Sequence, residues 1–460
     1  MATLHHFPSA LVSNWQSAVA KVASRARVDE RTALAAAHLA PVPVNFDDTL
    51  IAAANAVGQA AFDKQAGKSA APLAQAAVAT DVAGVAAGAK QCAAAAFELA
   101  RAKIEGNASA AEAASAQLQQ YGNCDPRWAE CVAEFVAHYS LARHCDVPYR
   151  RWKSPDDFVL SDLPTKCTIG IVGDWGTGDA RATELLRQVA SRQPDLVIHL
   201  GDIYYSCTAS EAERFYELCA EILPPGCRRF TLCGNHDMYA GGAPYYALLS
   251  HIQQPASFFC LRNDDWQILA ADTGYNDFDP EHVDDRASWV QDFDDPADPY
   301  SELVWHNHKF RTAGRRRTVL MSHHQPFTRN APIAGGAINR KLMHQFATWF
   351  PQIALWLWGH EHNQVIYAPF QDLEKGRCVG ASAIPNPSSC DLYSVDEKLR
   401  GLPPEQIPAI IDARLQVSAN ARLYNLGFAM LSLDGHEAAC EYFQYDSSAK
   451  TAASLYREQL

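Results

Sequence analysis

The sequence predicts an α/β domain that follows an all-α helical domain. Residues 1–150 are rich in alanine and place apolar residues at helical spacing. Beyond residue 167, short apolar runs alternate with helical segments, and each run ends in a cluster of polar residues. Between these halves, residues 151–166 combine prolines with mixed charges, which is typical of a linker. We therefore expect a helical domain at 1–150, a linker at 151–166 and an α/β domain at 167–460.

Three segments of the first half carry recognisable helix ends. Residues 46–64 carry two aspartates near their start, Asp47 and Asp48, which can cap or complement a helix N-terminus. Residues 107–122 end at a glycine, and residues 125–144 open with Asp-Pro, the usual order at a helix start. We expect four to six helices packed as a bundle, without a set of ligand residues.

The apolar runs of the second half predict buried strands. Runs that are apolar throughout indicate strands covered on both faces, as in sheets flanked by helices. In such sheets the carboxyl ends of the strands carry the chemistry, and every polar cluster falls at such an end. The predicted strands with their polar ends are 168–174, 194–202, 228–237, 266–274, 318–326 and 353–362.

Composition excludes several classes of protein. A formal net charge of -13 opposes binding to nucleic acid or to an anionic membrane surface. The alanine-rich stretch 70–100 is too weakly hydrophobic for a bilayer, and the first residues lack a secretory signal pattern, so we expect a cytoplasmic protein. The 13 cysteines are odd in number and form no CxxC pair, which favours reduced core thiols.

Taken singly, the polar clusters have ordinary explanations as tight turns, helix caps, buried histidines or a solvated loop. The turn at 173–179 is no phosphate-binding P-loop, because no Lys-Ser or Lys-Thr follows its second glycine. Taken together, five strand ends present carboxylate, amide and imidazole groups, a donor set suited to Fe, Mn or Zn. These donors are Asp174, Asp202, Asn235, His324, His360 and His362.

The series GD-x-G, GD-x-x-Y, GNHD, H-x-P and GH-x-H, at residues 173–362, resembles the calcineurin-like metallophosphoesterases and, within them, the purple acid phosphatases. The resemblance implies a four-layer α-β-β-α sandwich with two mixed sheets. It also implies hydrolysis of phosphate esters by attack of a hydroxide held at a dinuclear metal centre. It says nothing about residues 1–150.

Carried over to this chain, the resemblance implies seven metal ligands. Three would hold the first metal, three the second, and one would bridge both. In that order they are Asp174, Tyr205 and His362; Asn235, His324 and His360; and Asp202. The cations implied are Fe(III) with a divalent Fe, Zn or Mn, or else two Mn or two Zn ions.

Three assignments in this set have alternatives. His324 is preferred to His323 as the ligand because Pro326 completes His-x-Pro, which leaves His323 as a substrate contact or a buried histidine. Tyr205 stands in for the histidine that Gly176 replaces, and strand alternation directs the neighbouring Tyr204 elsewhere. If Tyr205 lies too far from the metal, Mn or Zn replaces ferric iron.

The same resemblance implies the catalytic groups. His236 would protonate the leaving oxygen, and Asp237 would orient that imidazole. The acidic insertion at 272–299 predicts a surface loop whose Tyr275, Asn276 and Asp277 line the entrance.

We expect a small phosphate ester as substrate, with no nucleic acid and no membrane as partner, and the helical domain as a surface for oligomer or partner contacts. The alternatives are a phosphodiesterase, a protein phosphatase whose helical half recruits the substrate, or an inactive scaffold.

Overall fold

The computed structural model describes residues 148–460 except 177, 179, 205, 206, 240, 278–287, 293–299, 331, 332, 334, 387, 389, 390 and 419–422. The predicted helical domain therefore lies outside the described residues apart from 148–150, and it stays a prediction. The described residues belong to one compact unit that begins at Val147.

One of two mixed sheets contains the first three predicted strands. Its order is β13-β12-β11-β2-β3-β4, with β2, β3 and β4 parallel and the other neighbours antiparallel. The strands are β2 (Lys166–Val172), β3 (Leu196–His199), β4 (Arg228–Thr231), β11 (Leu426–Asp434), β12 (Glu437–Asp446) and β13 (Thr451–Gln459).

The other sheet contains the remaining predicted strands, in the order β1-β5-β6-β7-β8-β10-β9. Its central strands β6, β7, β8 and β10 are parallel, and β5 and β9 run antiparallel to their neighbours β6 and β10. The strands are β1 (Val159–Leu160), β5 (Phe259–Arg262), β6 (Trp266–Ala270), β7 (Arg317–Ser322), β8 (Ile353–Trp358), β9 (Gln364–Ile366) and β10 (Gly376–Val379). Strand β1 lies within the predicted linker and pairs with β5.

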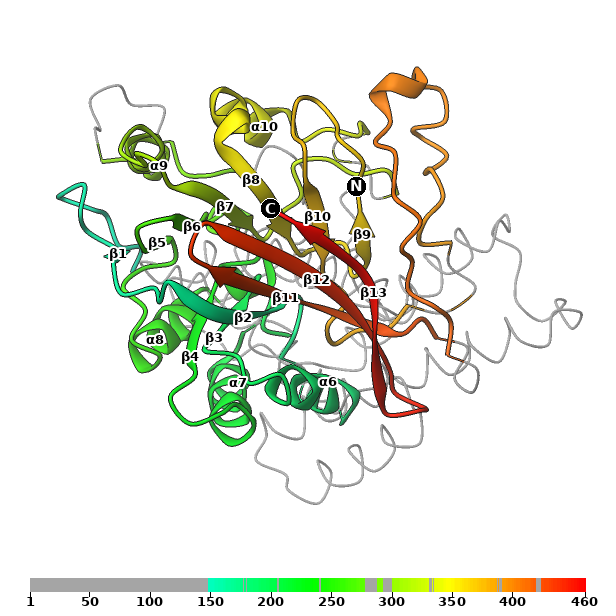
Figure 1. The fold of residues 1–460 in the computed structure, drawn as a ribbon, viewed down its shortest axis with the longest axis horizontal. Coiled ribbons are helices and arrows are strands. Elements are labelled where there is room, and N and C mark those ends of the chain that lie inside the picture. The colour runs from blue at the N-terminus through cyan, green and yellow to red at the C-terminus, as the bar shows by residue number, and fades with distance from the viewer. Residues whose placement is uncertain are drawn as a thin grey trace, which may run out of the picture. The chain divides into compact units, whose positions relative to one another are not determined.

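Helices cover the outer faces of the two sheets (Figure 1). On the first sheet lie α6 (Ala180–Ala190) and α7 (Ala209–Ile222), and α7 packs against α8 (Ala243–His251). On the second lie α9 (Glu302–Arg311) and α10 (Arg340–Phe346). Among the described residues, three 3-10 helices complete the elements: η2 (His236–Met238), η3 (Ala347–Gln352) and η4 (Pro404–Gln406).

The predicted four-layer α-β-β-α sandwich is confirmed, and strand β8 shows why its sequence is apolar throughout. Leu355 and Leu357 point into the core between the two sheets, whereas Trp356 and Trp358 pack into the core under α9 and α10. Successive side chains of a strand point to opposite faces, so a strand covered on both sides needs apolar residues at every position.

Helix starts follow the capping rules. Thr208 and Glu211 form a reciprocal capping box at α7, in which each side chain accepts from the other residue's backbone N–H. Ser301 caps α9 and Asn339 caps α10, each accepting from an N–H three residues on.

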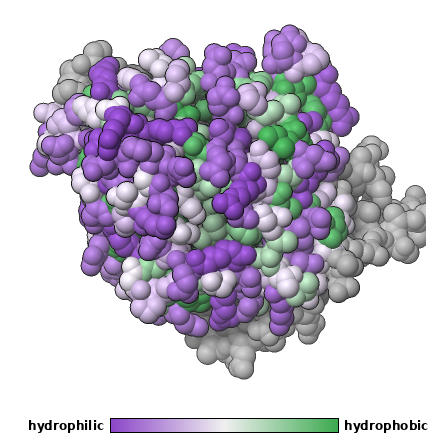
Figure 2. All heavy atoms as spheres, viewed as in Figure 1, coloured by the Kyte–Doolittle hydropathy of each residue, from purple (hydrophilic) through white to green (hydrophobic). Residues whose placement is uncertain are grey.

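The described surface carries no large continuous apolar area in the view of Figure 2, where hydrophobic residues are scattered among hydrophilic ones. Within the described part of the chain, no helix is both long and apolar enough to cross a membrane. The cysteines described are all free thiols, and all but Cys227 are buried, as the sequence predicted for core residues.

Candidate metal centre

The predicted site residues gather where the two sheets meet. The parallel registers align Val172, His199 and Thr231 at the ends of β2, β3 and β4, and Ser322 with Trp358 at the ends of β7 and β8. The polar residues that follow these five ends therefore face one another. Those brought together are Asp174, Asp202, Asn235, His236, His323, His324, His360 and His362, and all of them are buried.

Four of these residues adopt a left-handed backbone conformation. The φ angles are 56° at Asp174, 67° at Asp202, 69° at His360 and 43° at His362. Such conformations cost about 1 kcal/mol or more outside glycine and concentrate at functional sites. The strand ends therefore turn sharply, which directs these side chains into the space between the sheets.

Glycines allow the carboxylates to lie against the backbone. A Cβ added at Gly234 would lie 2.1 Å from Asp202 Oδ1, and one at Gly359 would lie 2.6 Å from Asp174 Oδ2. Both distances are shorter than any tolerated contact, so the glycines of GNHD and GHEH are required by close approach.

Asp202 occupies the middle of the cluster. Its Oδ1 accepts the backbone N–H of His236 at 2.9 Å, and its Oδ2 lies 3.2 Å from His323 Nε2. Its Oδ2 also lies 4.0 Å from His236 Nε2. This central position fits the bridging role that the resemblance implies.

Asp174 and the GHEH loop hold each other in place. Asp174 Oδ2 accepts the backbone N–H of His360 at 2.8 Å. Asp174 Oδ1 lies 3.5 Å from His362 Nε2. The first and last strand ends of the site are thus joined across the two sheets.

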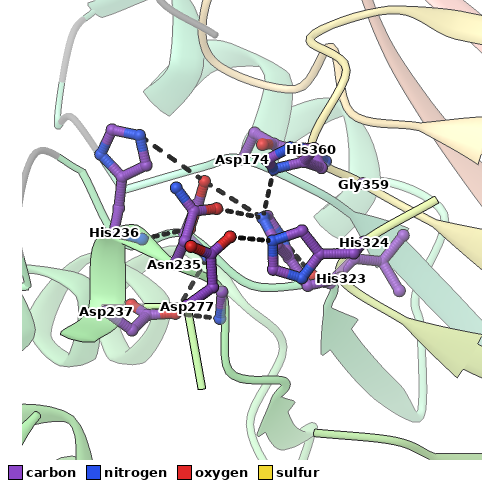
Figure 3. Close-up of polar contacts among 12 residues, drawn as sticks. Asp174, Asn235, His236, Asp237, Asp277, His323, His324, Gly359 and His360 are labelled. Carbon is purple, nitrogen blue, oxygen red and sulfur yellow. Dashed lines mark hydrogen bonds and ion pairs between the residues drawn. The ribbon is translucent and has the colours of Figure 1, made fainter. Parts of the chain in front are cut away.

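His323 lies among the candidate ligands in a way that the sequence did not favour (Figure 3). Its Nε2 lies 3.2 Å from Asp202 Oδ2, Asn235 Oδ1 and His360 Nδ1, while its Nδ1 faces the carbonyl oxygen of Leu200 at 2.9 Å. A metal-binding histidine usually has one ring nitrogen hydrogen-bonded to a backbone carbonyl and the other directed at the metal site. His323 has this arrangement, because its Nε2 faces the other candidate ligand atoms.

The neighbouring His324 is turned to the other side of the strand end. Its Nδ1 lies 3.0 Å from Thr273 Oγ1, and its Nε2 lies 3.0 Å from Asp277 Oδ2. Strand alternation explains the difference, because Val319 and Met321 of β7 point into the core between the sheets and His323, the first residue after β7, continues that alternate series. The sequence preference for His324 over His323 rested on Pro326 alone and ignored this register.

Both histidines nevertheless remain near the cluster. His323, His324 and His360 offer ring nitrogen atoms within 4.8 Å of one another. In a second group, carboxylate oxygens of Asp174 and Asp202 and a ring nitrogen of His323 lie within the same distance of one another. His323 is the residue that belongs to both groups.

The GNHD turn supplies an amide and an imidazole. Asn235 donates its Nδ2 to Tyr239 at 2.6 Å, which leaves its Oδ1 directed at the cluster. The His236 ring packs between the rings of Tyr204 and Tyr239, each with a centroid 4.6 Å away.

Asp237 has a different task from the one expected. Instead of meeting the His236 imidazole, its carboxylate accepts the backbone N–H groups of Asp202, Ile203 and Gly234 at 2.7 to 3.0 Å. Burial and the nearby Asp202 raise the pKa of Asp237 to about 7, although those three N–H groups act to lower it. Asp237 therefore fixes the turn that carries Asp202, and the expected orienting contact is replaced by this backbone support.

Tyr204 lies in the site, against the expectation that it points elsewhere. Its hydroxyl donates to Asp202 Oδ2 at 3.1 Å and to Asp174 Oδ1 at 3.2 Å, and it contacts His362 Nε2. The prediction failed because the turn after β3 does not continue the alternation of the strand. Tyr205 lies outside the described residues, so its role stays a prediction.

Two further side chains support the site without having been predicted. Glu361 points away from the neighbouring histidines, and its carboxylate accepts Trp358 Nε1 at 3.0 Å and contacts the Thr328 hydroxyl. His199 lies beneath the first turn, accepting the N–H of Trp175 at 3.1 Å, and burial lowers its pKa to about 3. The only sequence signal for the roles of Glu361 and His199 is that each lies next to or near a residue of the motifs.

The electrostatics of the cluster suit a cation. Burial alone would raise the pKa of Asp202, but the facing His323 and His236 imidazoles hold it well below its usual range. Burial disfavours a charged His323, yet Asp202 raises the pKa of that imidazole to about 9. The buried carboxylates thus call for positive charge, and the oxygen and imidazole donors fit Fe, Mn or Zn.

Comparison with known proteins identifies the class. The model of the calcineurin-like phosphoesterase family matches residues 167–364. This part of the chain is similar to the domain of that family. None of the curated proteins compared with the chain matches it significantly.

Two solved structures are among those to which the chain is similar. One is the purple acid phosphatase PPD1 from yellow lupin (Lupinus luteus), with 12% identity and a TM-score of 0.41, covering 65% of this chain and 55% of the lupin chain. The other is a dimetal phosphatase from Danio rerio, with 13% identity and a TM-score of 0.37, covering 63% of this chain and 98% of the other. The match thus spans little more than half of the lupin protein.

Proposed function

We propose that the protein hydrolyses phosphate esters at a dinuclear metal centre. The observation that carries this proposal is the convergence of two carboxylates, an amide oxygen and the imidazoles of His323 and His360 from both sheets. His323 Nε2 lies 3.2 Å from one donor atom of each of Asp202, Asn235 and His360. A cation at this point would therefore have several donor atoms close to it. A scaffold would have no physical need for so complete a buried donor set.

The metal ligands that we propose are those of the family pattern. Asp174, Tyr205 and His362 would hold one cation, and Asn235, His360 and one of the paired histidines the other. Asp202 would serve both. Bound cations of this kind lower the pKa of a water and neutralise charge on a phosphate.

The remaining groups bind and move protons. His236 is our candidate for protonating the leaving oxygen, because its ring is buried at the edge of the cluster 4.0 Å from Asp202. Asp237 contributes by holding the turn between them.

We assign the protein to the purple acid phosphatase branch on one motif, GD-x-x-Y, in which Tyr205 would bind Fe(III) as phenolate. Tyr204 supports the same region from its contacts with Asp174 and Asp202. If Tyr205 is no ligand, two Mn or two Zn ions are the proposed cofactors.

We further propose a small phosphate ester or nucleotide as the substrate. The net charge of -13 and the acidic insertion disfavour nucleic acid and anionic membranes as partners. Oligomer or partner contacts through the N-terminal helical half are part of the same proposal.

The test is a substrate panel on metal-loaded protein. We expect the protein to hydrolyse p-nitrophenyl phosphate faster than bis(p-nitrophenyl) phosphate. We expect H236A to lose this activity. Activity confined to phosphopeptides would favour a protein phosphatase, and activity on none of these would overturn the proposal.

The visible spectrum of the iron-loaded protein tests the branch assignment. We expect a broad phenolate band that Y205F abolishes and Y204F retains. If Y204F abolishes the band and Y205F retains it, Tyr204 is the residue that binds iron as phenolate.

A further inference from the structure

A buried carboxyl group lies behind the site, at the first residue of α9. Glu302 is 1% exposed. Its Oε1 accepts the backbone N–H of Asp272 at 2.9 Å and lies 3.0 Å from His306 Nε2. Its Oε2 accepts the hydroxyl of Tyr149 at 2.9 Å. Glu302 thus joins three separate segments at one point.

The segment that Glu302 holds is the loop 272–277, which follows β6. Asp272 Oδ1 accepts the N–H of Gly274 at 3.1 Å and that of Tyr275 at 2.9 Å. The N–H of Asp277 donates to the carbonyl oxygen of Gly274 at 2.9 Å. These bonds fix the conformation of the loop from its first residue, so displacement of Asp272 would shift the whole loop.

Two side chains of this loop hold His324. Thr273 Oγ1 accepts the backbone N–H of His324 at 3.0 Å and lies 3.0 Å from its Nδ1. Asp277 Oδ2 lies 3.0 Å from His324 Nε2. The His324 ring centroid is 4.5 Å from that of His360, so the orientation fixed in this way belongs to the metal centre.

We propose that Glu302 is a positioning residue of the hydrolytic site, which sets the loop 272–277 and, through Thr273 and Asp277, the orientation of His324. This inference rests on the proposed function, because it concerns how well the same site works. It does not depend on whether His324 binds a cation or the substrate.

Tyr149 connects Glu302 and the loop 272–277 with the first residues of this unit. Its ring packs on Tyr275, with centroids 4.4 Å apart, in addition to its hydrogen bond with Glu302. Trp152 Nε1 donates to the carbonyl oxygen of Ser301 at 2.9 Å, beside Glu302. The joining segment 149–152 therefore braces both the start of α9 and the loop.

Stability alone does not account for an acid at this point. Burial is the largest cause that raises the pKa of Glu302 to about 8, and burial with the nearby Glu302 raises that of Asp272 to about 7. Two buried carboxyl groups cost free energy that well-packed apolar side chains would not. What the carboxyl adds is two acceptor oxygens in fixed directions, which an apolar residue lacks.

The test is a double-mutant cycle between Glu302 and His324, with kcat, KM and thermal stability measured for each metal-loaded variant. We expect E302A to lower kcat about tenfold or more. We expect E302Q to restore most of it, because the amide oxygen still accepts from Asp272. In an H324N background, E302A should have little further effect on kcat while still lowering thermal stability.

Additive losses of kcat in E302A and H324N would overturn the proposal, since they would mean that Glu302 does not act through His324. If H324N is too slow to measure, D277N takes its place, because Asp277 lies on the same path and leaves both histidines intact. The control is F310L, which loosens α9 in the core without touching Glu302 and should retain kcat. Lack of activity in the unmodified protein would instead count against the proposed function.

Discussion

The carboxyl group of Glu302 makes the stability of the fold depend on pH in a predictable direction. Burial raises its pKa from an ordinary value of 4.5 to about 8, although the N–H of Asp272 and the Tyr149 hydroxyl act to lower it. An unfolded chain releases this proton from about pH 4.5, whereas the folded chain keeps it until about pH 8. The stabilisation is thus complete below pH 4.5 and is lost as pH rises to about 8.

The size of the effect follows from the width of that window. Each pH unit within it lowers the free energy of unfolding by about 1.4 kcal/mol for one group. Between pH 5 and 8, Glu302 therefore accounts for up to roughly 4 kcal/mol. The other titratable groups around it are Tyr149, Asp272, Tyr246 and His306, and only Asp272 also has a pKa raised to about 7.

Urea unfolding of metal-free protein at pH 5, 6, 7 and 8 measures this dependence. We expect the free energy of unfolding of E302Q, relative to that of the unmodified protein, to rise by about 2 to 4 kcal/mol between pH 5 and pH 8. The reason is that the amide keeps the geometry of the carboxyl group without ionising. Chelation beforehand removes the separate pH dependence of metal binding. Parallel stability curves for the two proteins would refute the reasoning.

Two further predictions concern the metal centre. H323A should lose far more bound metal than H324A, because His323 belongs to both donor groups; metal analysis of the two purified variants showing the reverse would restore the sequence preference. G234A should bind metal at least about tenfold more weakly while keeping its circular dichroism spectrum, because the new Cβ would lie 2.1 Å from Asp202 Oδ1. G401A, where no atom lies within 4 Å, is the matched control, and equal metal affinity in both variants would contradict the prediction.

The strands were predictable where their burial leaves a mark in the sequence. β8 is apolar at every position because both of its faces are covered, and the middle of β7 is apolar at Val319, Leu320 and Met321 for the same reason. β13 was not predicted, because it is an edge strand whose residues are mostly exposed or half-buried and therefore show no apolar run. β9, of three residues, is too short to show a period.

The site was predictable as a set of strand ends, and less so in its orientations. Asp174, Asp202 and Asn235 follow from the rule that chemistry lies at carboxyl ends. The choice between His323 and His324 needed the strand register, which the Pro326 motif does not reveal. Tyr204 and Asp237 differed from expectation because tight turns, unlike strands, do not fix the direction of a side chain by alternation.

The residues that hold His324, directly or through the loop 272–277, illustrate what sequence cannot supply. Asp277 was expected only to line the entrance, and Glu302 carried no signal as the first residue of a helix. The contact of Glu302 with Asp272 joins residues 30 positions apart, and that of Asp277 with His324 joins residues 47 positions apart, so only the folded chain brings them together.

Whether the site holds two metal ions is decided by the metal content of the purified protein and of D202N, after reconstitution of both with Fe, Mn or Zn. We expect about two metal ions per chain in the unmodified protein. We expect D202N to lose at least one of them, because Asp202 lies at the middle of the donor set. An unmodified protein that binds no metal, or a D202N variant that keeps both ions, would contradict a dinuclear centre at this site.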